Sequence, residues 1–328
     1  MESLYYVLTW LCHRSCAHCY DDRFRPYHGV EREEQVRMAE RNAPRIVANL
    51  PKRLSYRDWN DGLREKAGRI ILAGGEILLP AIRERVLYPA LAQLRSRYEG
   101  GAKVIVQTTG DTLRRDLVGE LLSLGVWMIS VSGMDEYHEG IEIDELRARL
   151  AGWFESFGMK PGEAASTAGS GPYYHFFGAA PGSWIGKLWP RGRAMANELS
   201  SADLSENFCN RWSGGVNFLA RGHSGSEVSI DPEGKVYPCC PKTRLALGSL
   251  LEEPLESILK RCEGNPVYEA ISMGHPERMG IAHGWSVDRF LEESQIRLPS
   301  GRIYRNLCIG CDRFHDQVLA PQLVQLAR

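Results

Sequence analysis

The sequence predicts an α/β protein, in which a partial (β/α) barrel of about five or six parallel strands is followed by a small α+β module. Two observations indicate this fold. Short apolar, β-prone runs alternate with amphipathic helical segments through the first half of the chain, and the pattern changes to a hairpin and short helices after residue 200. Strands separated by helices and buried on both faces form a parallel sheet. We place the two units at residues 1–195 and 196–328.

The predicted strands and helices of the first unit follow one another as four βα repeats. Apolar residues spaced three and four apart indicate each helix, and short runs rich in Val, Ile and Leu indicate each strand. The expected strands are 5–11, 69–73, 103–108 and 126–131, and the expected helices are 36–50, 82–94, 113–124 and 146–154. The aromatic run 173–177 predicts a fifth strand.

The second unit begins with a predicted hairpin. Two β-prone runs, 227–230 and 235–237, flank the turn sequence Asp231-Pro232-Glu233-Gly234. Helices are expected near 254–262, 286–297 and 312–327.

Composition and charge exclude several classes of function. The 328 residues are 43% hydrophobic and 25% charged, as in a soluble enzyme-sized protein. The net charge of −1 provides no field that would recruit nucleic acid or an anionic membrane. Because the sequence has neither a spanning apolar run nor an export signal, we expect a cytoplasmic protein without nucleic-acid or membrane partners.

The nine cysteines fall into two groups, and the first group is the triplet Cys12, Cys16 and Cys19. The triplet follows the first predicted strand, and the carboxyl ends of strands are where parallel α/β barrels place their chemistry. Three thiolates on one loop can bind three irons of a 4Fe-4S cluster and leave the fourth iron open. A zinc site completed by His13 or His18 is the alternative.

This spacing resembles the signature of the radical S-adenosylmethionine (SAM) enzymes, Cys-x3-Cys-x-aromatic-Cys, with His18 in the aromatic position. Three further motifs extend the resemblance, because each follows a predicted strand: Gly74-Gly75-Glu76, Thr108-Thr109-Gly110 and Ser130-Val131-Ser132-Gly133. Two positions depart from the family pattern. Ile77 stands where proline is common, and Ser132 stands where aspartate is frequent.

The resemblance implies a 4Fe-4S cluster on the triplet, with SAM on its open iron. An external one-electron reductant such as flavodoxin or ferredoxin would drive cleavage of SAM to a 5′-deoxyadenosyl radical. The residues expected to contact SAM are Gly74, Gly75, Glu76, Thr109, Ser130, Ser132 and Arg193.

The second cysteine group resembles the SPASM and twitch extensions of this family, which carry auxiliary clusters. Because the chain has no cysteine after Cys311, the resemblance implies a twitch-like module with one auxiliary 4Fe-4S cluster. Its expected ligands are Cys209, Cys239, Cys308 and Cys311. Cys240 is an alternative to its neighbour, and a four-cysteine zinc site is an alternative to the cluster.

The expected reaction is a net oxidation or bond formation on a small natural product or peptide, with the auxiliary cluster accepting an electron. In a second hypothesis the protein is an epimerase or peptide maturase, and Cys240 or Cys262 donates a hydrogen atom to the substrate radical. The remote alternative is a zinc-binding interaction module without enzymatic activity.

Overall fold

A computed structural model describes residues 1–138, 143–162, 171–178, 187–211 and 217–322. Its main sheet has nine strands in the order β11-β10-β9-β1-β4-β5-β6-β8-β7. The strands that the first unit contributes to this sheet run parallel, which confirms the predicted partial barrel of five or six strands. They are β1 (Ser3–Val7), β4 (Arg69–Ala73), β5 (Lys103–Thr108), β6 (Met128–Val131), β8 (Tyr173–Phe176) and the short edge strand β7 (Lys160–Pro161).

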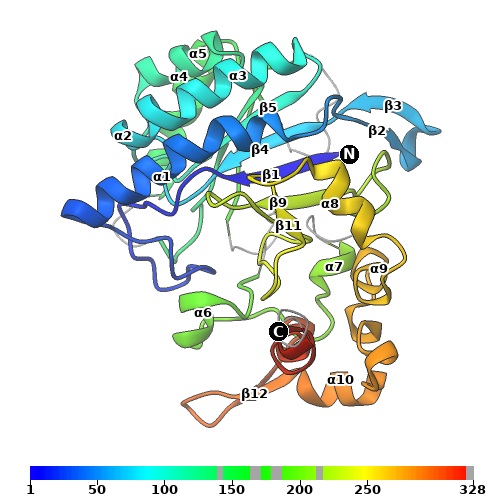
Figure 1. Ribbon diagram of the computed structural model, residues 1–328. Helices are drawn as coiled ribbons and strands as arrows, with labels where there is room; N and C mark the ends of the chain where they lie inside the picture. Colours follow the sequence, from blue (N-terminus) through cyan, green and yellow to red (C-terminus); the bar gives the residue numbers. More distant parts are fainter. Residues whose placement is uncertain (139–142, 163–170, 179–186, 212–216, 323–328) are drawn as a thin grey trace.

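Helices of the first unit cover one side of this sheet (Figure 1). They are α1 (Gly29–Ala48), α2 (Pro80–Ile82), the π-helical turn η2 (Arg83–Leu87), α3 (Tyr88–Tyr98), α4 (Arg115–Ser123) and α5 (Ile143–Ser156). The predicted apolar stripe of α1 is buried, because Val36, Ile46 and Val47 are each at most 3% exposed. No helix in these described ranges has the length and hydropathy that a membrane span requires.

The second unit extends the same sheet. Strand β9 (Glu227–Ile230) pairs in parallel with β1, with Ser3 opposite Glu227, and continues as an antiparallel hairpin into β10 (Lys235–Tyr237) and then β11 (Gly248–Ser249). The Asn42 side chain on α1 donates a 2.9 Å hydrogen bond to the Pro232 carbonyl oxygen. The two predicted units therefore share one sheet and one hydrophobic core.

The short helices of the second unit are α6 (Gly192–Ala196), α7 (Phe208–Arg211), α8 (Leu255–Cys262), α9 (Pro266–Ser272), α10 (Val287–Glu293) and α11 (Leu307–Phe314). Helices α6, α7, α9 and α10 lie on the other side of the sheet from α1 and α3 (Figure 1). Helix α8 lies beside the end of α1, where the Leu255 amide donates a 3.0 Å hydrogen bond to the Asn49 carbonyl oxygen. Single helical turns lie at η3 (Pro276–Arg278), η4 (Ile281–His283) and η5 (His315–Leu319).

Two sequence-based expectations about helix bounds are wrong, and one hairpin was missed. The helix expected at 286–297 ends at Glu293, because Gln295–Arg297 forms strand β12 against β13 (Ile303–Arg305). The helix expected from 312 begins at Leu307, because the Asn306 side chain accepts a hydrogen bond from the Cys308 amide and caps it. The polar hairpin of β2 (Ser55–Asp58) and β3 (Arg64–Ala67) was not predicted from the sequence.

Candidate active site

A cavity of about 230 Å³ lies at the carboxyl ends of the parallel strands. It is lined by the loops after β1, β4, β5 and β6, together with residues of the second unit. The structure brings most of the predicted site residues to this cavity: Cys12, Cys16, Cys19, Gly74, Gly75, Thr109, Ser132, Arg193 and Cys240. These residues come from segments that are far apart in the sequence, so their convergence is a property of the fold.

The cysteine triplet lies on a loop that the backbone holds at both ends. The Cys12 amide donates to the Arg25 carbonyl oxygen at 3.0 Å, and the Cys19 amide donates to the Cys16 carbonyl oxygen at 3.2 Å. Burial raises the pKa of Cys12 to about 12 and the pKa of Cys19 to about 11. Thiols that resist ionisation in the empty protein ionise when they bind a metal, because the metal's charge stabilises the thiolate.

Gly75 allows the loop after β4 to pack against the backbone of the cysteine loop. A Cβ atom at this position would lie 2.3 Å from the Leu11 carbonyl oxygen and 2.8 Å from the Cys12 nitrogen. The Gly75 amide donates a 3.0 Å hydrogen bond to the Thr9 carbonyl oxygen. The absence of a side chain therefore positions Cys12 directly, as well as leaving backbone atoms open to the cavity.

Glu76 orders the loops beside the cavity through its carboxylate. The side chain is 1% exposed and accepts hydrogen bonds from the Thr109 amide (2.9 Å), the Thr109 hydroxyl (2.7 Å) and the Leu78 amide (2.9 Å). Thr109 itself lines the cavity. Ser130 is buried on β6 between Gln107 and His175, and the Ser132 hydroxyl donates to the Thr108 carbonyl oxygen at 3.2 Å.

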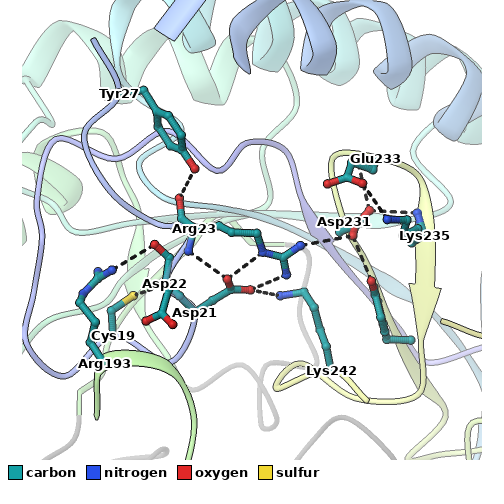
Figure 2. A network of polar contacts seen from close by, with 11 residues as sticks. Cys19, Asp21, Asp22, Arg23, Tyr27, Arg193, Asp231, Glu233, Lys235 and Lys242 are labelled. Carbon is teal, nitrogen blue, oxygen red and sulfur yellow. Dashed lines mark hydrogen bonds and ion pairs between the residues drawn. The ribbon is translucent and has the colours of Figure 1, made fainter. Parts of the chain in front are cut away.

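Arg193 holds the cysteine loop by its backbone. Its guanidinium donates to the carbonyl oxygens of Cys16 (2.8 Å), Phe24 (2.8 Å) and Asp22 (3.2 Å), and Figure 2 shows the side chain beside Asp22 and Cys19. The following residue adds a bond, because the Ala194 amide donates to the Cys19 carbonyl oxygen at 3.2 Å. Helix α6 therefore holds the triplet loop in place through these hydrogen bonds.

An ion-pair network connects the triplet loop with the segment that carries Cys240 (Figure 2). Asp21 accepts two hydrogen bonds from the Arg23 guanidinium, at 2.9 and 2.8 Å, and one from Lys242 Nζ at 2.9 Å. Burial favours the protonated form of Asp21, but Arg23 and Lys242 outweigh it and lower its pKa to about 2. The Lys242 side chain is only 6% exposed, so this pair lies away from solvent.

The second cysteine group forms a separate site. Cys209 lies on α7, Cys239 follows β10, and Cys308 and Cys311 lie on α11. Burial raises the pKa of the Cys209 thiol, and its three neighbours Cys239, Cys308 and Cys311 raise it further. The influence of these three thiols on Cys209 indicates that Cys209 lies near them.

A family model identifies this second site. Residues 223–312 match the model of SPASM, an iron–sulfur cluster-binding domain. This part of the chain is similar to SPASM domains. The match confirms the sequence-based recognition of an iron–sulfur module in the second half, and the SPASM segment contains Cys239, Cys308 and Cys311.

Known proteins offer only distant further comparisons. No curated protein sequence matches the chain. The structure of BtrN in complex with AdoMet and 2-DOIA is 12% identical, with a TM-score of 0.46 over 84% of this chain and 88% of that one. Native anSMEcpe with bound AdoMet is 12% identical, with a TM-score of 0.43 over 100% and 99% of the two chains. SuiB of Streptococcus suis bound to S-adenosylmethionine is 10% identical, with a TM-score of 0.33 over 82% and 67%.

The two surplus cysteines of the second unit have different surroundings. Cys240 lines the main cavity, and its thiol donates to the carboxylate of Glu227 at 3.6 Å, a side chain that is 2% exposed. Cys262 is 2% exposed in the apolar core around α8, where its thiol donates to the Ile258 carbonyl oxygen at 3.4 Å. The neighbouring residues Cys239 and Cys240 thus face two different sites.

Two groups of residues at these sites were not predicted from the sequence. In the cavity, His138 Nδ1 lies 2.8 Å from the buried Asp135 carboxylate, and its ring centroid lies 4.5 Å from that of His18. Beside Cys239, Cys308 and Cys311, which we call the SPASM cysteines, Arg191 forms an ion pair with Asp312. The spacing Asp135-x2-His138 was visible in the sequence, but no local pattern indicated Arg191.

Proposed function

We propose that the chain is a radical SAM enzyme that oxidises a small natural product or a peptide. One observation carries the proposal. The triplet Cys12, Cys16 and Cys19 opens from the end of β1 into a cavity that is also lined by Gly75 and Thr109. Three thiolates facing an open space are the donor set of a 4Fe-4S cluster with one iron free for SAM.

The residues at both sites fit the groups that this function requires. The triplet would hold the first 4Fe-4S cluster and leave one iron open, and Cys209, Cys239, Cys308 and Cys311 would complete the ligation of an auxiliary 4Fe-4S cluster. When bound, the first cluster and SAM supply a 5′-deoxyadenosyl radical, and the auxiliary cluster supplies a one-electron acceptor. An external reductant such as flavodoxin or ferredoxin would provide the electron for SAM cleavage.

The chain's own residues position the reaction. Arg193 and Gly75 fix the cysteine loop from its two sides, and Thr109 and Ser132 line the cavity in which SAM would bind. An oxidation requires the substrate to lose one hydrogen atom to the 5′-deoxyadenosyl radical and then one electron and one proton. SAM and substrate then give methionine, 5′-deoxyadenosine, oxidised substrate and a proton.

Replacing Cys12, Cys16 and Cys19 together by alanine is expected to abolish SAM cleavage and to leave the auxiliary site filled. The two sets share no ligand, and the SPASM thiols lie on different elements. Anaerobic reconstitution followed by chromatography of 5′-deoxyadenosine and iron analysis tests this expectation. Persistent 5′-deoxyadenosine formation by the triple variant would exclude the assignment.

The position of Cys240 favours a second candidate function, a redox-neutral epimerisation or maturation. A thiol on the cavity wall could return a hydrogen atom to a substrate radical, and the bond to Glu227 orients that thiol. Cys262 lacks this access, since it lies in the core around α8.

Turnover in heavy water distinguishes the two candidates. We expect a product two electrons more oxidised than the substrate, without deuterium at the attacked carbon. If Cys240 is the donor, one deuterium is fixed per turnover, because a thiol proton exchanges with solvent. That label would be lost in Cys240→Ala and kept in the matched control Cys262→Ala. Mass spectrometry of the product measures both the oxidation level and the deuterium content. A deuterium label that depends on Cys240 would contradict the oxidation and support the second candidate function.

A further inference from the structure

We propose that Arg191 is a positioning residue of the auxiliary cluster, which donates an N–H···S hydrogen bond to it and raises its reduction potential. The proposal rests on the proposed function, because it requires a cluster at the SPASM cysteines. It deepens that function by naming the residue that makes the auxiliary cluster an electron acceptor.

The Arg191 side chain lies against the SPASM cysteines. It is 11% exposed, forms an ion pair with Asp312, and donates from Nη1 to the Cys308 carbonyl oxygen at 3.5 Å. Both contacts lie on α11, the helix that carries Cys308 and Cys311. The guanidinium is therefore held beside the expected ligands of the auxiliary cluster.

One donor of this guanidinium has no partner within the described part of the chain. Arg191 Nε is buried, and no hydrogen-bond acceptor lies within reach of it. A buried N–H group without an acceptor has lost its hydrogen bonds to water without replacing them, so such groups normally have a partner. The sulfur atoms of a cluster on Cys239 and Cys308 would supply the acceptor that the protein lacks.

The charge of Arg191 determines the direction in which it shifts the reduction potential of the auxiliary cluster. A 4Fe-4S cluster with four thiolate ligands is an anion, and reduction adds one more negative charge. A nearby cation stabilises the reduced form more than the oxidised form, and a site away from water screens this attraction weakly. Hydrogen bonds to cluster sulfurs also tune these potentials. Asp312, which carries the opposite charge at the same site, acts in the opposite direction.

The neighbouring arginine provides a matched control. Arg191 and Arg193 lie two residues apart in one turn, but Arg193 donates to the Cys16 carbonyl oxygen of the triplet loop. Gly192 lies between them, where a Cβ atom would meet the Tyr20 carbonyl carbon at 2.7 Å. Disturbing the turn at Arg193 therefore affects the first cluster loop and leaves the charge at the SPASM cysteines unchanged.

The test is a redox titration of the full-length enzyme with both clusters, followed by electron paramagnetic resonance. Added SAM alters the signal of the open cluster only, which separates the two signals. We expect a more negative auxiliary potential in Arg191→Met, a smaller shift in Arg191→Lys, and a more positive potential in Asp312→Asn. The ratio of 5′-deoxyadenosine to product should rise in Arg191→Met, because electron acceptance becomes less favourable.

Opposite shifts in Arg191→Met and Asp312→Asn, with an unchanged auxiliary potential in Arg193→Met, support the proposal. If Arg191→Met fails to hold the auxiliary cluster, the auxiliary reduction potentials of Arg191→Lys and Asp312→Asn decide whether Arg191 has the proposed role. Unchanged potentials in those variants overturn the role of Arg191 while the SAM-dependent signal leaves the radical SAM function intact. An enzyme without any SAM-dependent signal would instead overturn the proposed function.

Discussion

Two charged residues that were expected to contact SAM form hydrogen bonds that hold the loops around the cavity. Glu76 uses its carboxylate on the amide and hydroxyl of Thr109, and Arg193 uses its guanidinium on three carbonyl oxygens of the cysteine loop. Both residues lie beside the cavity, so position along the chain predicted their neighbourhood correctly. Their partners could not be predicted, because a backbone carbonyl carries no sequence signal. At the scale of single residues, the site is therefore shaped largely by groups that hold loops.

His315 makes the folded protein sensitive to acid. Its side chain is fully buried and neither ring nitrogen has a hydrogen-bond partner among the described residues. Burial, with Arg191 and Arg244, lowers its pKa to about 4. An unfolded histidine titrates near 6.5, so below that pH the unfolded state binds more protons and stability falls until the pH reaches the folded pKa.

Replacing His315 by phenylalanine is expected to flatten this profile. Between pH 7.5 and pH 5.5 the wild type should lose about 1 kcal/mol more of its unfolding free energy than the variant. Anaerobic urea denaturation at the two pH values measures the difference. His28→Ala, which removes an exposed histidine at the start of α1, is the control for the loss of a histidine as such. Equal profiles for wild type and His315→Phe would contradict the expectation.

At the scale of elements, short helices and turns bring distant loops together. Helix α6 has only five residues, yet its amino-terminal turn contacts the triplet loop on one side and the SPASM cysteines on the other. The close approach is possible because Gly192 adopts a φ of +50° and has no side chain. No sequence pattern indicated that Arg191 and Arg193 contact two different sites.

Gly192→Ala is expected to dislodge the triplet loop. A Cβ atom there would lie 2.7–2.8 Å from backbone atoms of Cys19 and Tyr20, in addition to the strain of a positive φ. The variant should lose the SAM-dependent cluster, about four irons per chain, and with it 5′-deoxyadenosine formation. Iron analysis and chromatography of 5′-deoxyadenosine measure the two losses.

Gly29 offers a control matched in conformation. Its φ is +52° and no atom lies within 4 Å of an added Cβ. Gly29→Ala therefore carries the backbone strain alone, about 1–2 kcal/mol, and should keep full iron content. Equal iron loss in both variants would show that strain, and not the contact with Cys19, is responsible.

At the scale of the whole molecule, the two predicted units form one continuous sheet. Strand β9 of the second unit pairs with β1, the strand that leads into the triplet, and the polar contact between Lys242 and Asp21 adds a second connection. Cys239 and Cys240 lie between the two sites and each contributes to a different one. This arrangement places the SPASM cysteines next to the cavity, as an electron acceptor for a substrate radical must be.

Metal content tests this two-site arrangement. Two 4Fe-4S clusters require about eight irons and eight sulfides per chain, whereas a zinc-containing second site leaves about four irons and one zinc. Elemental analysis of anaerobically prepared protein is expected to give the first result. A content of four irons and one zinc would remove the electron acceptor and with it the oxidation.

The sequence by itself determined the parallel α/β fold, most helices and strands, and the two cysteine groups. These features depend on local periodicity and on residue spacing within single loops, which the chain carries regardless of how its segments pack. Only the tertiary structure decided that Cys240 faces the cavity while Cys239 faces the other cysteines, and that Arg191 lies beside them. The physical reason is that these outcomes depend on which side of a turn a side chain leaves, and on which distant backbone it meets. Burial and packing across the shared sheet settle both questions.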